Sequence, residues 1–194
     1  MLGAKLALLL ATTAAASNEA GQRFLEENKR RDGVVVLPSG LQYKVLRSGD
    51  GEHHPTVGSS CECHYEGRTA QQWPEGETFD SSYKRGSPTS FAPNQVIKGW
   101  TEAMQLMVEG DKWEMYIPYH LAYGEHGKPP KIPAKATLIF IMELVRIKGA
   151  SKPVEDFPQW SPEDLTLWTS KDQNACDEWT AKKVKAFEAG DAKL

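Results

Sequence analysis

The sequence predicts an α+β domain in which several antiparallel β-strands pack against one short α-helix. From Val34 onward, short segments of alternating apolar and polar residues are separated by turn residues, which is typical of strands. One strong helix signal interrupts them, within residues 94–111. Residues 137–147 form a long β-branched and apolar run, as expected of a central strand. We expect the helix to cover the concave face of the sheet, with loops around the cavity between them.

Residues 1–16, MLGAKLALLLATTAAA, have the organisation of a secretory signal peptide. Lys5 supplies a positive charge, Leu6–Leu10 begin an apolar core, and Ala14–Ala16 fit a cleavage site of small residues. An ordinary helix and the first part of a bipartite organelle signal are the alternatives. After residue 20 no segment is long and apolar enough to span a membrane, so we expect no transmembrane segment in the mature chain.

Residues 17–33 are predicted to form a short helical lead-in. The stretch EAGQRFLEENKRR (19–31) is highly charged, and Asp32-Gly33 is a pair that ends helices. Phe24 and Leu25 are its main apolar residues. Because this apolar surface is too small for a strong dimerisation helix, we expect a solvated lead-in and a monomeric protein.

Side-chain periodicity predicts the strands and the helix of the domain, residues 34–148. Alternation predicts strands at 41–45, 61–68 and 112–118, and the apolar run near residue 140 completes the sheet. The helix is indicated by apolar residues at helical spacing, with Gly110 expected to close it. These apolar residues are Ile97, Trp100, Met104 and Met107.

Residues 149–194 are predicted to be a mostly helical C-terminal extension of unknown role. A proline-rich connector precedes two helix candidates, which begin at Ser161 and Ser170. Such an arm either docks on a partner through its aromatic residues or folds back on the domain. The aromatic candidates are Trp160, Trp168 and Trp179.

Composition and polar residues exclude several classes of function. The formal net charge of −3 gives no reason to expect nucleic-acid binding. The histidines show neither metal-ligand spacing nor a nucleophile partner, and phosphate-binding glycine motifs are missing, so we expect no metal and no cofactor. Cys61 and Cys63 alternate with polar residues in one strand, which favours buried thiols over a redox pair.

Aromatic side chains at strand ends and beside the helix are candidates for a binding site. Taken singly, each is most simply explained as core. However, six segments resemble, in order and spacing, the FKBP-type peptidyl-prolyl cis-trans isomerases, and the lead-in is similar to the macrophage-infectivity-potentiator branch. The segments are VLPSGLQYKVL (36–46), CHYEGR (63–68), FDSSYKRGSPTSF (79–91), QVIKGWTEAMQLM (95–107), YHLAYGEHG (119–127) and IPAKATLIFIMELVRI (132–147).

The resemblance implies a curled antiparallel sheet wrapped around one short α-helix, and a proline pocket between them. Trp100 matches the pocket floor, and the Ile97 N–H and the Tyr123 hydroxyl match groups that hold substrate carbonyls. The implied catalytic residues are Asp80, Tyr123 and Phe140. The implied substrate-binding residues are Tyr65, Phe79, Arg85, Phe91, Val96, Ile97, Trp100 and Ile132.

The implied reaction is rotation about X–Pro bonds, whose uncatalysed rate is slow because of partial double-bond character. A dry aromatic cavity favours the twisted amide, so no nucleophile is required. Asp80 either polarises the amide or braces Tyr65 and Arg85. The implied partners are proline-containing polypeptides and macrolide inhibitors of the immunophilin type. The alternative function is a proline-peptide binding or chaperone module with little catalytic activity.

Two positions depart from the best-known members of the family. Thr89 stands where an aromatic residue often widens the pocket rim, and Lys128 stands where histidine is common. Together with Lys131 and Lys135, Lys128 makes the rim basic. Macrolide affinity and peptide preference are therefore open.

The expected location is the secretory pathway or the ER lumen, because a signal peptide acts before any C-terminal address. The C-terminal AKL is similar to a peroxisomal signal, and a bipartite signal would lead to a plastid.

Overall fold

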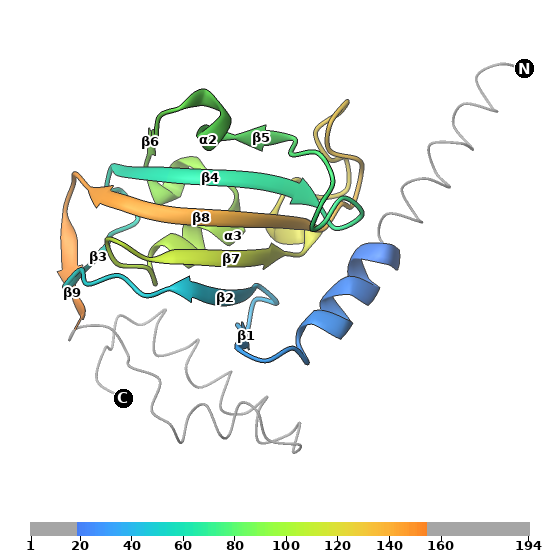
Figure 1. Ribbon diagram of the computed structural model, residues 1–194, viewed down its shortest axis with the longest axis horizontal. Helices are drawn as coiled ribbons and strands as arrows, with labels where there is room; N and C mark the ends of the chain where they lie inside the picture. Colours follow the sequence, from blue (N-terminus) through green and yellow to red (C-terminus); the bar gives the residue numbers. More distant parts are fainter. Residues whose placement is uncertain (1–18, 155–194) are drawn as a thin grey trace, which may run out of the picture. The chain divides into compact units, whose positions relative to one another are not determined.

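A seven-stranded antiparallel sheet is the framework of the computed structural model, which describes residues 19–154 (Figure 1). Hydrogen-bonded neighbours follow the order β1-β2-β7-β8-β4-β5, and β6 also pairs with β4. β3 (His53–Pro55) and β9 (Ser151–Pro153) form a separate two-stranded sheet. The strands of the large sheet are β1 (Val34–Val36), β2 (Gln42–Arg47), β4 (Cys61–Thr69), β5 (Asp80–Ser81), β6 (Thr89–Phe91), β7 (Lys112–Ile117) and β8 (Leu138–Ile147).

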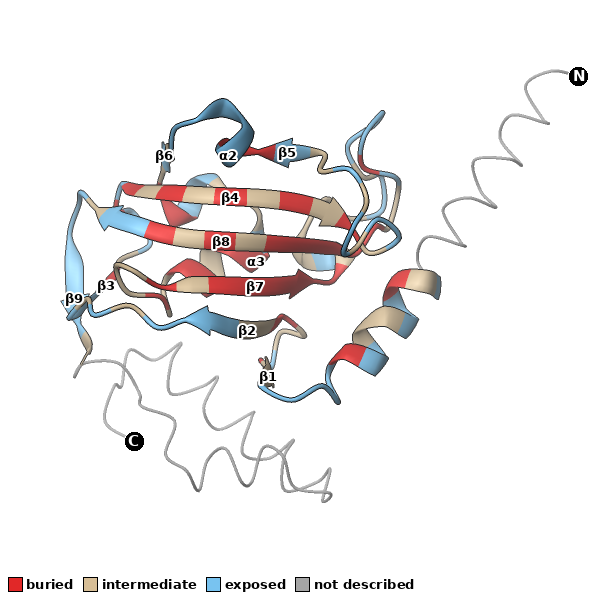
Figure 2. Cartoon of the chain, viewed as in Figure 1, coloured by how far each residue is buried: buried red, intermediate tan, exposed pale blue. Residues whose placement is uncertain are grey.

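The predicted central strand is confirmed as β8, which lies between β7 and β4. Its apolar residues and those of β7 form a largely buried band across the sheet (Figure 2). β4 confirms the predicted alternation, because every second residue from Cys61 to Thr69 is buried and those between are half-buried. The α+β fold class is therefore confirmed.

The predicted helix is present but shorter than expected. α3 spans Lys98–Met104 and buries Gly99, Trp100, Ala103 and Met104 against one face of the sheet. Gly110 does not close it, because Gly110 lies in the turn before β7 with a φ of +90°. The remaining short helices are α2 (Ser82–Arg85), η1 (Pro93–Gln95) and η2 (Tyr119–Leu121).

The lead-in helix, residues 19–28, is not the solvated segment that its charge suggested. Asn28 is 1% exposed and donates a hydrogen bond to the Gln42 side chain at 2.9 Å. Gln42 in turn donates to the Leu25 carbonyl at 3.0 Å. The Phe24 ring lies 5.9 Å from that of Tyr116 on β7. The helix therefore packs on the sheet through one buried amide pair and one ring contact.

Cys61 and Cys63 are both buried free thiols, as the alternation predicted. Burial, with a smaller contribution from the charge of Glu109, raises the pKa of Cys61 to about 11. Burial also raises the pKa of Cys63. Both thiols are therefore protonated at neutral pH, which argues against a redox pair.

Several predictions fall on residues outside the described range, among them the signal peptide and the helices of the C-terminal extension. Within residues 19–154, no helix has the length and apolar character needed to cross a membrane.

Candidate functional site

The indole of Trp100 occupies the centre of an aromatic cluster. Its ring centroid lies 4.8 Å from that of Phe140, 4.9 Å from that of Tyr65 and 5.2 Å from that of Phe91. The Phe140 and Tyr65 rings stand nearly perpendicular to the indole, at 77° and 74°. These are the edge-to-face geometries that aromatic pairs prefer. The cluster joins three strands, β4, β6 and β8, to α3.

Trp100 is only 5% exposed, yet its Nε1 has no hydrogen-bond partner within the described residues. A buried indole N–H is usually paired, because leaving it unpaired costs free energy. The floor of the cluster therefore combines an apolar surface with one available donor, which suits a ligand that is mostly apolar.

Phe79 extends the cluster, and Gly67 makes room for it. The Phe79 and Phe140 rings meet edge to face at 5.5 Å and 85°. Gly67 on β4 lies beneath this pair, since a Cβ there would stand 2.6 Å from Phe79 Cζ and 2.8 Å from Phe140 Cδ1. Gly67 was missing from the predicted site residues, although a glycine inside a strand is a recognised sign of close approach.

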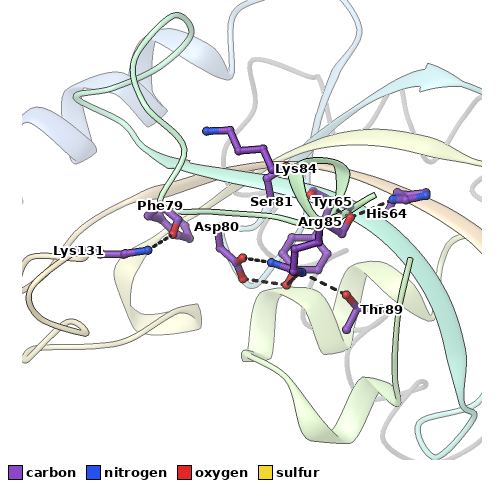
Figure 3. A network of polar contacts seen from close by, with 10 residues as sticks. His64, Tyr65, Phe79, Asp80, Ser81, Lys84, Arg85, Thr89 and Lys131 are labelled. Carbon is purple, nitrogen blue, oxygen red and sulfur yellow. Dashed lines mark hydrogen bonds and ion pairs between the residues drawn. The ribbon is translucent and has the colours of Figure 1, made fainter. Parts of the chain in front are cut away.

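A network of polar contacts links Tyr65, a member of the aromatic cluster, to Asp80 and Arg85 (Figure 3). The Tyr65 hydroxyl donates to Asp80 Oδ2 at 2.8 Å and accepts from Arg85 Nη2 at 2.8 Å. Arg85 also forms an ion pair with Asp80 Oδ1 and donates to Thr89 Oγ1 at 3.3 Å. Its guanidinium lies 5.4 Å from the centre of the Tyr65 ring. The predicted residues on β4, β5 and α2 are thus joined in one network.

This network sets the charge state of its members. Partial burial alone would raise the pKa of Asp80, but hydrogen bonds from Tyr65 and Arg85 and the positive charge of Arg85 outweigh it and lower that pKa. Burial, followed by the hydrogen bond to Asp80, raises the pKa of Tyr65. Asp80 is therefore an anion and Tyr65 a neutral donor at physiological pH.

Ser82 and His64 support this network from behind, and the sequence did not single them out. Ser82 is fully buried, and its hydroxyl accepts from the Tyr65 N–H at 2.7 Å and donates to the Tyr65 carbonyl at 3.2 Å. His64 Nδ1 lies 3.0 Å from the same hydroxyl. The hydroxyl fixes the backbone at the point where the Tyr65 ring enters the cluster.

The remaining predicted residues lie on the loops that flank the cluster. Val96 and Ile97 are half-buried just before α3, and the Ile97 carbonyl accepts from the Trp100 N–H at 2.9 Å. Ile132 is 3% exposed in a hairpin closed by two backbone hydrogen bonds with Lys128. Tyr123 is half-buried and has no ring contact with Trp100 within the described residues. The structure thus brings most of the predicted site residues into contact. Ring contacts and side-chain hydrogen bonds join Tyr65, Asp80, Arg85, Phe91, Trp100 and Phe140, and Phe79 contacts Phe140. Val96, Ile97, Ile132 and Tyr123 lie outside this set of contacts.

Within residues 19–154, no three His, Cys, Asp or Glu side chains lie together in a way that suits a metal ion. The site itself presents apolar rings, the Asp80–Arg85 pair and hydrogen-bond donors.

Comparison with known proteins defines the class to which this fold and site belong. Residues 51–145 match the model of the FKBP-type peptidyl-prolyl cis-trans isomerases, and residues 4–45 match the domain that lies amino-terminal to such isomerases. The chain belongs to the FKBP-type peptidyl-prolyl cis-trans isomerase family, which confirms the resemblance found in the sequence.

Particular relatives fall within the branch that the lead-in indicated. The chain is 47% identical over 132 residues to the macrophage infectivity potentiator of Trypanosoma cruzi, covering 68% of this chain and 65% of that protein. It is 46% identical over 130 residues to the peptidyl-prolyl cis-trans isomerase Mip of Coxiella burnetii, covering 67% of this chain and 54% of that one. A crystal structure of a peptidyl-prolyl cis-trans isomerase from Pseudomonas syringae superposes with a TM-score of 0.61 at 34% identity, covering 69% of this chain and 95% of that one. The chain therefore spans about half to two thirds of the length of these curated relatives.

Proposed function

We propose that this protein is a peptidyl-prolyl cis-trans isomerase that accelerates rotation about X–Pro bonds during protein folding. The observation that carries the proposal is the buried Trp100 indole with aromatic rings on several sides. A proline ring is apolar and flat enough to lie on such a floor. Family membership supports the same activity.

Catalysis in this proposal comes from the environment of the amide. The planar amide carries charge separation that is lost when the bond twists, so a dry aromatic cavity favours the twisted transition state. The Ile97 N–H and the Tyr123 hydroxyl hold the carbonyls that flank the proline, and the Trp100 Nε1 is a further available donor. Phe140 closes the wall beside the rotating bond.

Asp80 acts in this proposal through the groups that it holds. Its two carboxylate oxygens are already bonded to Tyr65 and Arg85, so its negative charge fixes the Tyr65 ring at the edge of the pocket. In this proposal the same charge also acts on the developing dipole in the amide. The remaining pocket residues, Phe79, Phe91, Val96 and Ile132, shape the walls.

The decisive experiment is a protease-coupled assay with a proline tetrapeptide, using the purified protein with and without residues 1–16. We expect acceleration over the uncatalysed rate. Asp80→Leu and Phe140→Tyr should lower kcat/KM while circular dichroism and the unfolding midpoint change little. Absence of acceleration together with measurable peptide binding would instead indicate a proline-binding or chaperone module. Full activity in both variants would refute the assignment of the site.

The location, the assembly and the inhibitors of the protein belong to the same proposal. We propose that the protein enters the secretory pathway, because residues 1–16 have the pattern of a signal peptide. N-terminal sequencing of the native protein tests this location. An intact Met1 would refute it in favour of the peroxisomal alternative. Light scattering tests the proposed monomer. A macrolide titration of the isomerase activity tests inhibitor binding.

A further inference from the structure

Two lysine charges beside the pocket have no role in the proposed function. Of the three lysines on the rim, Lys135 forms an ion pair with Glu125 at 2.8 Å. Lys128 and Lys131 are exposed and pair with no carboxylate within the described residues. The rim therefore presents two positive charges that remain available to a ligand.

Both ammonium groups lie next to residues of the aromatic site. Lys128 Nζ is 5.5 Å from the centre of the Tyr123 ring. Lys131 Nζ donates to the Phe79 carbonyl at 3.1 Å, so its side chain reaches across from the hairpin to the start of β5 (Figure 3). An ammonium has three donors, so Lys131 retains others for a ligand.

The hairpin that carries these lysines is anchored in the pocket wall. The Lys128 N–H donates to the Ile132 carbonyl at 2.8 Å, and the Ile132 N–H donates back at 3.1 Å. Ile132 itself is 3% exposed. These bonds fix the backbone of the hairpin, so both lysine side chains start from defined positions.

The charged pair of the polar network does not cancel them. The carboxylate of Asp80 is already matched by the guanidinium of Arg85, so that pair carries no net charge. Lys128 and Lys131 therefore add positive charge on the side of the hairpin, and such charge attracts anionic ligands over a distance of roughly the Debye length, about 8 Å at physiological salt.

We propose that Lys128 and Lys131 make this site selective for proline peptides that carry an acidic side chain next to the proline, on the flank held by Tyr123. This inference rests on the proposed function and names its preferred substrate class. In this proposal the carboxylate meets the ammonium groups while the proline ring lies on Trp100. The effect has the size of an exposed ion pair, about two- to five-fold in affinity.

The test uses tetrapeptides that are identical except for Glu, Gln or Lys at the position before or after proline. For each, kcat/KM is measured at low salt and at about 0.5 M NaCl, where the Debye length is only a few ångströms. The same peptides are tested on Lys128→Gln/Lys131→Gln and on the control Lys29→Gln, which removes one positive charge just after the lead-in helix. The ratio of the Glu to the Gln peptide corrects for any general loss of activity in a variant.

At low salt we expect the ratio of kcat/KM for the Glu peptide to that for the Gln peptide to be about two to five at one of the two positions. This ratio should approach one at high salt and in the double variant. It should persist in Lys29→Gln. A ratio of one at both positions, or a ratio that survives in the double variant, would overturn the inference. Peptide binding followed by NMR shifts separates the two proposals. Binding that prefers the Glu peptide without any turnover would retain this inference and refute the isomerase activity alone.

Discussion

Replacing Gly67 by alanine is expected to damage the site from beneath, without changing any residue that a substrate touches. The added Cβ would lie 2.6 Å from Phe79 Cζ and 2.8 Å from Phe140 Cδ1. Since carbon atoms normally stay at least about 3.5 Å apart, the two rings must move by about 1 Å. Forcing an extra methyl into a packed site typically costs about 1–3 kcal/mol of unfolding free energy.

The displacement matters more for activity than for stability. A misplacement of about 1 Å in a reacting group can lower the rate roughly a hundred-fold. We therefore expect Gly67→Ala to reduce kcat/KM by about one to two orders of magnitude in the proline-peptide assay, while urea denaturation still shows a cooperative transition. Gly58→Ala is the matched control, because a Cβ added at Gly58 would have no atom within 4 Å of it. If Gly67→Ala keeps the full rate, the Phe79–Phe140 pair does not form the working wall of the pocket.

Three further predictions concern charge, packing and thiol chemistry. The folded state lowers the pKa of Asp80, so the ionised carboxylate stabilises the protein fully above about pH 4. This stabilisation is lost as the pH falls through the lower pKa of the folded state. The difference in unfolding free energy between wild type and Asp80→Asn should shrink over the same pH range. Asn28→Ala leaves the buried Gln42 side chain without its donor and should cost about 1–3 kcal/mol in urea denaturation. Cys61 and Cys63 should resist a thiol reagent in the native protein at about pH 8, since burial raises both pKa values, and should react on unfolding.

Each of these three predictions can be contradicted by a specific result. A stability gap for Asp80→Asn that grows as the pH falls would contradict the assigned charge state. An unchanged midpoint for Asn28→Ala would show that the lead-in helix is not held by its amide. Rapid labelling of Cys61 and Cys63 in the folded protein would revive a thiol-exchange function.

The periodicity of apolar side chains predicted the strands whose faces are most clearly buried. β4 and β8 were predicted because one face of each strand, or both, must be buried, and that requirement is written in the residue order. The end of α3 was not predicted, because the spacing of Met107 continued the helical pattern past a turn that Asp111 holds through the Val108 N–H. The spacing of apolar residues indicates which residues are buried. It does not distinguish a residue buried in a helix from one buried in the turn that follows the helix.

The packed lead-in escaped prediction for a different reason. Its contact with the sheet depends on the amides of Asn28 and Gln42 and on one ring, so hydrophobicity alone gave too little signal. Within the site, the aromatic residues were predicted through the family resemblance. Gly67 and Ser82 were missed because each acts on another residue rather than on a ligand.

The edge strands of the main sheet have a consequence for aggregation with extended polypeptides. The outermost strands are short, because β1 contains three residues, β5 two and β6 three. An extended polypeptide adds readily to a long, open edge and can then recruit further strands. A protein that repeatedly meets extended clients would polymerise with them if it carried such an edge. Under the proposed function, short outer strands would let the protein bind an extended client at the aromatic site without becoming a template for aggregation.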